Sequence, residues 1–92
     1  MIAGLLTLTF RLEGCSSLKE RRQRLSGLRD RFGRLPQIAV CEEPSDNLKH
    51  ACWQFLALTQ ARPQAEQLLT GIEQYAAAEL DAVVIGQAVE WL

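Results

Sequence analysis

The sequence predicts an α+β domain in which two helices cover one face of a four-stranded antiparallel sheet. Its 92 residues suffice for one domain, so we expect residues 1–92 to form a single unit. Apolar patterns follow one another in the order strand, helix, strand, strand, helix, strand. An apolar fraction of 48% and a charged fraction of 23% are typical of a soluble globular protein. No apolar run approaches the roughly 18 residues of a membrane span, so we expect a cytoplasmic protein without membrane contact.

The first half of the chain predicts a strand and a basic helix. Residues 2–12 alternate between apolar side chains on one face and mixed side chains on the other. The segment Ser17-Leu18-Lys19-Glu20 is a capping box, in which we expect Glu20 to reach back to the amide of Ser17. The helix continues to Phe32 and stops at Gly33. Its apolar stripe consists of Leu18, Leu25, Leu28 and Phe32. Arg21 falls inside that stripe and therefore needs a carboxylate partner or a path to solvent.

The second half predicts the remaining elements. Residues 37–43 form a short strand, and residues 44–47 supply a turn. Residues 51–60 form a third strand that directs Trp53 and Phe55 into the core. A second helix starts at Pro63, because proline suits the first helical position. Residues 82–92 form a fourth strand, with one face made of Val83, Ile85, Val89 and Trp91. Right-handed crossovers then give a ferredoxin-like βαββαβ sandwich with strand order 4-1-3-2.

Three cysteines and one histidine are the candidate metal ligands. Cys15, Cys41 and Cys52 show neither a CxxC motif nor a zinc-type spacing. Cys41, His50 and Cys52 are expected near one end of the second and third strands, and Cys15 at the opposite end. Four ligands would then not meet, so we expect no metal and no cofactor.

Three stretches resemble a known family: MIAGLLTLTFRLEG, SLKERRQRLSGLRDRF and LKHACWQFLALTQARPQAEQLLTGIEQY. With these motifs the chain resembles the YlxP-like bacterial proteins, which form domain of unknown function 503. It departs from the family pattern at Lys49, where an aromatic residue is usual. The resemblance implies a ferredoxin-like fold and no established activity. Members are often encoded beside translation and ribosome-maturation factors, which implies a connection with the ribosome by association.

The charge distribution gives the main functional signal. Residues 1–34 carry eight basic and three acidic side chains, whereas residues 35–92 carry two basic and eight acidic ones. Arginine forks suit phosphates, so the first helix is a candidate surface for the ribosome or structured RNA. The candidate nucleic-acid-binding residues are Arg11, Lys19, Arg22, Arg24, Arg29 and Arg31. The alternative is that these arginines are a solvated helix face, or that they pair with Glu66 and Glu73 on the second helix.

The open sheet face suggests a different class of function. It carries no aromatic side chain on its two central strands, so RNA stacking on the sheet is not expected. Its apolar side chains instead suggest a homo-oligomer interface made of Leu5, Thr7, Leu56 and Leu58. An acylphosphatase-like hydrolase is a remote third alternative, because the sequence lacks the glycine-rich loop and the arginine–asparagine pair of that site. We therefore expect a protein that is not an enzyme and has no small-molecule substrate.

Overall fold

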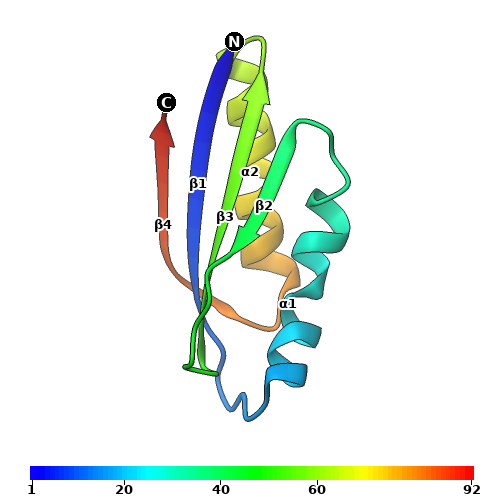
Figure 1. The fold of residues 1–92 in the computed structure, drawn as a ribbon, viewed down its shortest axis with the longest axis vertical. Helices are drawn as coiled ribbons and strands as arrows, with labels where there is room; N and C mark the ends of the chain where they lie inside the picture. The colour runs from blue at the N-terminus through cyan, green and yellow to red at the C-terminus, as the bar shows by residue number, and fades with distance from the viewer.

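The computed structural model describes residues 1–92 and has the predicted order of elements. The elements are β1 (Ile2–Arg11), α1 (Leu18–Phe32), β2 (Ile38–Glu42), β3 (His50–Thr59), α2 (Arg62–Glu79) and β4 (Val83–Trp91). All strand pairs are antiparallel, and the sheet order is β2-β3-β1-β4. The ferredoxin-like prediction and its strand order are therefore confirmed (Figure 1).

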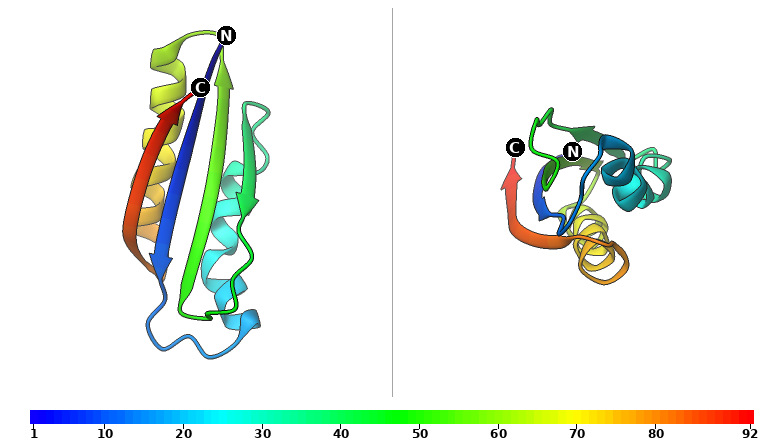
Figure 2. Two further views of the ribbon diagram at one scale, coloured as in Figure 1. Left: turned by 60° about the vertical axis from the view of Figure 1, so that its left-hand side comes forward. Right: turned by 90° about the horizontal axis from the view of Figure 1, so that it is seen from below.

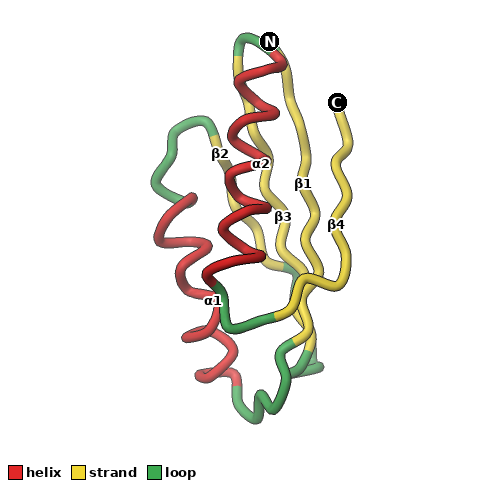
Figure 3. Tube along the Cα trace, turned by 180° about the vertical axis from the view of Figure 1, so that it is seen from behind, coloured by secondary structure: helices red, strands yellow, loops and turns green.

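The molecule has two layers. Both helices lie on the same face of the sheet, and the opposite face is uncovered (Figure 2). Seen from the helix side, α1 lies toward β2 and α2 runs along the central strands (Figure 3). The two edges of the sheet are β2, beside α1, and β4, on the far side. Neither helix is both long and apolar enough to span a membrane.

The core forms between the helices and the inner face of β1 and β3. Leu6, Leu8 and Phe10 of β1 are fully buried, as the alternation of residues 2–12 predicts. The ring of Phe32 packs edge-on against Phe55, with 6.4 Å between ring centroids. This close packing fixes α1 against β3, so the exposed side of the helix has a defined position relative to the sheet.

The connection from β1 to α1 places the start of the helix. Gly14 adopts a positive φ of 68°, a conformation that glycine takes at little steric cost. The Ser17 hydroxyl accepts a hydrogen bond from the Glu20 amide at 3.1 Å, as expected of the capping residue. The Glu20 carboxylate accepts from the amide of Ser16 at 2.8 Å. The prediction that Glu20 accepts from the amide of Ser17 is therefore wrong. The donor is the amide of the preceding residue, Ser16, which lies closer to the carboxylate as the chain enters the helix.

Two predicted apolar faces need correction. Leu18 is 47% exposed, so the buried stripe of α1 consists of Arg21, Leu25, Leu28 and Phe32. The predicted apolar face of β4 does not form, because the register with β1 shifts between Thr9 and Phe10. Beyond this bulge Val83 pairs with Arg11 on the open face, whereas Val89 pairs with Leu6 on the helix face.

Candidate functional site

Arg21 is a structural residue. It is only 8% exposed, and its Nη1 donates to the backbone oxygens of Asn47 at 3.1 Å, His50 at 3.3 Å and Ser45 at 3.4 Å. The partner predicted from the sequence was a carboxylate or solvent. Three backbone carbonyls take that place instead, and they tie the β2–β3 turn to the first turn of α1.

Arg11 and Arg24 are paired with carboxylates. Arg11 lies 2.7 Å from the carboxylate of Glu13. Arg24 lies 3.4 Å from Asp81 and 3.5 Å from Glu20, and its side chain is 17% exposed. It also donates to the backbone oxygen of Glu13 at 2.8 Å. These two members of the predicted nucleic-acid surface are therefore neutralised within the fold, and Arg24 joins α1 to the loop before β4.

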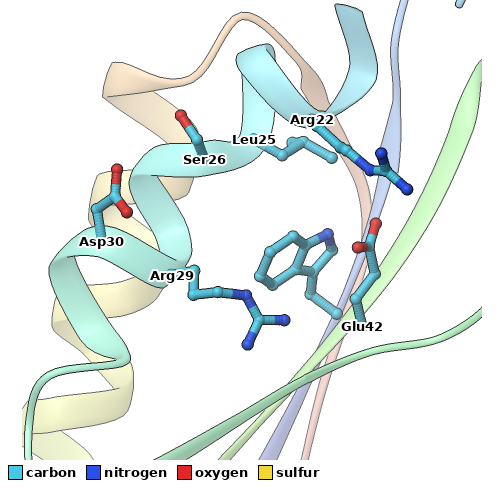
Figure 4. Close-up of a pocket in the computed structure, with 7 residues that line it drawn as sticks. Arg22, Leu25, Ser26, Arg29, Asp30 and Glu42 are labelled. Atoms are coloured by element: carbon cyan, nitrogen blue, oxygen red, sulfur yellow. The ribbon is translucent and has the colours of Figure 1, made fainter. Parts of the chain in front are cut away.

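Arg22 and Arg29 lie beside a groove between α1 and the β2–β3 edge of the sheet. The groove has a volume of about 250 Å³. Figure 4 shows that Arg22, Leu25, Ser26, Arg29 and Asp30 come from the helix and Glu42 from the opposite strand. Neither arginine forms an ion pair, although Glu42 and Asp30 line the same groove. Because no carboxylate of the protein pairs with them, both guanidinium groups are available to a ligand.

Trp53 forms part of the groove wall. The guanidinium carbon of Arg29 lies 5.4 Å from the centroid of the Trp53 ring, a cation–π distance. The ring is 4% exposed, and its buried Nε1 donor has no hydrogen-bond partner. A buried indole N–H usually has a partner, so this donor is an unmet hydrogen-bonding requirement next to the groove.

The remaining predicted basic residues lie at the margins. Lys19 is exposed one helical turn before Arg22 and extends the same flank. Arg31 lies on the other flank, 5.0 Å from the centroid of the Tyr75 ring. No arginine of α1 forms an ion pair with Glu66 or Glu73, so the predicted pairing between the two helices is wrong. Glu66 pairs with Arg62 of its own helix at 2.8 Å instead.

The predicted interface residues do share the open sheet face. Leu5 pairs with Leu56, and Thr7 pairs with Gln54, on adjacent central strands. Leu56 and Leu5 are half-buried, whereas Leu58 is 47% exposed. The face is therefore a shallow apolar strip with one prominent leucine.

The cysteines and His50 lie differently from the prediction. Arg11, at the end of β1, pairs with His50 at the start of β3, so Cys15 belongs to the same end of the sheet as His50. The prediction that Cys15 lies at the opposite end of the sheet from Cys41, His50 and Cys52 was wrong. In the antiparallel pair, β3 begins beside the end of β1. Cys15 is 2% exposed and Cys41 is exposed. No three histidine, cysteine or acidic side chains gather in a possible metal-binding group.

Sequence reasoning assigned only Arg22 and Arg29 to a site and missed the other five groove residues: Leu25, Ser26, Asp30, Glu42 and Trp53. Trp53 was assigned to the core, which is correct, but its contact with Arg29 depends on how α1 crosses the sheet. Glu42 is the cross-strand partner of Trp53, so the strand pairing brings it to the groove. The register of β2 against β3 is the signal that identifies it.

The fold and this groove define a small ferredoxin-like α+β protein with a groove of mixed charge beside one sheet edge. The chain belongs to the family described as "Protein of unknown function (DUF503)", whose model matches residues 3–88. This is the family that the resemblance had named. No curated protein matches the chain. Among solved structures, the chain is similar to the de novo designed protein Ferredog-Diesel, with 11% identity and a TM-score of 0.46. That alignment covers 96% of this chain and 83% of the designed one.

Proposed function

We propose that the protein is a non-enzymatic accessory protein that contacts RNA, on the ribosome or in another structured form, through the groove between α1 and β2. One observation carries the proposal. Arg11 and Arg24 are paired with carboxylates, whereas Arg22 and Arg29 have no ion-pair partner and frame a groove of about 250 Å³. Free guanidinium groups held on a rigid helix are suited to phosphate recognition.

The groove offers RNA more than its two guanidinium groups. Arg22 and Arg29 are seven residues apart, or about 10 Å along the helix axis, so they can contact different phosphates. Glu42 and Asp30 supply acceptors for the amino groups on exposed base edges. The two acids also reduce the attraction of the groove for arbitrary polyanions, in agreement with a pI near 5.8.

The direct test is co-sedimentation of the untagged protein with purified ribosomal particles across a salt series. We expect binding at low salt that weakens as salt rises, because phosphate contacts release counterions. The Arg22→Glu/Arg29→Glu variant should lose this binding. The matched control is Arg34→Glu/Lys49→Glu, which makes the same change in charge at exposed, unpaired sites outside the groove and should bind much more strongly than the groove variant.

Two outcomes would refute the proposal. The first is an absence of co-sedimentation at low salt. The second is an equal loss of binding in the groove variant and in the control. That result would show that binding depends on the net charge of the protein and not on the groove.

A second candidate function is a protein-interaction module built on the open sheet face. The exposure of Leu58, at 47% on an uncovered face, is the observation that favours it. Light scattering of the wild type and of Leu58→Lys tests it. A dimer that dissociates in Leu58→Lys would support it, and a particle mass unaffected by the substitution would remove its basis.

The acylphosphatase-like alternative predicts turnover of acetyl phosphate, and a lack of turnover would exclude it.

A further inference from the structure

The outer edge of β4 lacks the features that usually keep an edge strand from pairing. β4 is nine residues long and has β1 as its only neighbour. It contains no lysine, arginine or proline, and Glu90 is its single charge. Three of its apolar side chains are exposed: Val83 at 45%, Ile85 at 47% and Val89 at 42%. Edge strands are usually blunted by charge, proline or shortness, as in the five-residue β2 that precedes Pro44.

The hydrogen-bond pattern shows which backbone groups of β4 point outward. The amide of Leu92 donates to the oxygen of Ala3, so this pair is a hydrogen-bonded one. Antiparallel ladders alternate, which makes Trp91, Val89 and Gln87 the non-hydrogen-bonded partners of β1. The amides and carbonyls of these three residues therefore point away from β1, outward at the free edge of the sheet. The bulge lies before Gly86, so the register from Gly86 to Trp91 is unbroken.

From this geometry we infer that β4 pairs antiparallel with β4 of a second copy, on a two-fold axis at Ala88, to give one continuous eight-stranded sheet. This register is self-complementary. It exchanges hydrogen bonds between the outward groups of Gln87 and those of Val89 in the second copy, twice by symmetry.

Charge is compatible with this arrangement. Glu90 lies opposite Gly86 of the second copy. The two Glu90 residues are four positions apart along the strand direction, about 13 Å. A two-fold arrangement thus brings no like charges together, and the strand has no positive charge that would call for an acidic partner.

The dimer has a consequence for the groove between α1 and β2, and this consequence alone depends on the proposed function. The axis is perpendicular to the sheet, so the helices of both copies lie on the same side. The two grooves lie at the outer β2 edges, separated by seven strand spacings, or about 34 Å. A dimer would thus present two RNA-contacting grooves facing the same side, and occupation of both would raise the apparent affinity by avidity.

Disulfide cross-linking tests the register. The background is Cys41→Ser/Cys52→Ser, which leaves only the buried Cys15. In this background Ala88→Cys places two thiols directly opposite each other in a non-hydrogen-bonded pair, at a separation that a disulfide accommodates. We expect a dimer band on a non-reducing gel after mild oxidation with glutathione disulfide. Glu90→Cys, which is also exposed, should give little or none, because the two thiols would lie about 13 Å apart along the strands.

A second variant distinguishes edge pairing from other contacts. Gln87→Pro removes an outward amide without removing a bond to β1, so the monomer should keep its circular dichroism spectrum. We expect it to abolish the Ala88→Cys cross-link and to halve the particle mass measured by light scattering. Three outcomes would overturn the inference. These are no cross-link at Ala88→Cys, equal cross-linking at Glu90→Cys, or a dimer that survives Gln87→Pro and dissociates in Leu58→Lys. None of these outcomes depends on whether RNA binds.

Discussion

The guanidinium group of Arg21 donates a hydrogen bond of 3.1 Å to the backbone oxygen of Asn47. This bond links the start of α1 to the β2–β3 turn, 26 positions later in the chain. Together with the bonds to Ser45 and His50, it replaces the carboxylate that a buried arginine usually requires. The neighbouring Arg22 has no such bond, so adjacent residues of one basic run have separate roles.

This division of roles predicts different costs of mutation. Arg21→Met keeps most of the side-chain volume but removes the donor that three backbone carbonyls share, of which only that of Asn47 keeps another donor, the His50 amide. The free energy of unfolding should therefore fall by about 2–3 kcal/mol. Arg22→Met should change it by less than about 0.5 kcal/mol, because the side chain is exposed and unpaired. Urea denaturation of both variants measures the difference. Equal effects would show that Arg21 does not hold the turn.

The contact between the two helices depends on Gly27. A Cβ atom at this position would overlap the hydroxyl of Tyr75. Gly27→Ala should therefore lower the stability by about 1 kcal/mol or more, although alanine favours helices by about 1 kcal/mol over glycine.

The double mutant isolates this clash. In a Tyr75→Phe background, which lacks the overlapping oxygen, Gly27→Ala should cost markedly less or become stabilising. Thermal or urea unfolding of the four proteins completes the cycle. Strict additivity of the two substitutions would contradict the predicted contact.

Glu20 makes the start of α1 sensitive to acid. The hydrogen bond from the Ser16 amide, with smaller contributions from the Cys15 thiol and Arg24, holds the pKa of Glu20 below its ordinary value of 4.5. The unfolded chain then binds this proton more readily than the folded chain. The stabilisation is complete above the ordinary value and is lost as the pH falls through the lowered folded value. Glu20→Gln should therefore reduce the dependence of the urea midpoint on pH in the acid range, and an unchanged dependence would argue against the capping bond.

The three cysteines should react with alkylating reagents in a fixed order. Cys41 is exposed and should react first. Burial, followed by the charge of Glu43, raises the pKa of the Cys52 thiol, so its reactive thiolate is scarcer at mildly alkaline pH and it should react more slowly. Cys15 is 2% exposed and should react only on unfolding. Mass spectrometry after timed alkylation gives the order, and early labelling of Cys15 would contradict the packing at the start of α1.

Local pattern predicted most of the fold. The alternation of residues 2–12, the Ser17 cap and Pro63 near the start of α2 identified elements whose predicted bounds differ from the observed ones by at most one residue. The register shift opposite Thr9 was not predictable, because a bulge leaves no periodic signal where the strand begins with the continuous apolar run Val83-Val84-Ile85. The apolar face assigned to β4 failed for that reason.

The candidate site was predicted only in part. The position of Arg22 and Arg29 on one flank of α1, and of Arg24 and Arg31 on the other, follows from helical spacing alone. Arg24 also pairs with Asp81, which lies 57 positions later in the chain. This long-range pairing is set by how the elements pack and is not encoded in any local spacing. The pairs of Arg11 with Glu13 and of Arg24 with Glu20 are local, and the second has the i,i+4 spacing of a helical ion pair.

The most direct test of the RNA-contacting groove uses Trp53 as its own reporter. The chain has two tryptophans, so Trp91→Phe leaves Trp53 as the sole one, with the Arg29 guanidinium 5.4 Å from its ring centroid. Purified ribosomal RNA is titrated into this protein while the tryptophan emission is recorded. Engagement of Arg29 by phosphate should change the emission, added salt should reverse the change, and Arg22→Glu/Arg29→Glu should not respond to RNA. An emission that stays constant at low salt, or an equal response in the groove variant, would contradict the claim that this groove contacts RNA.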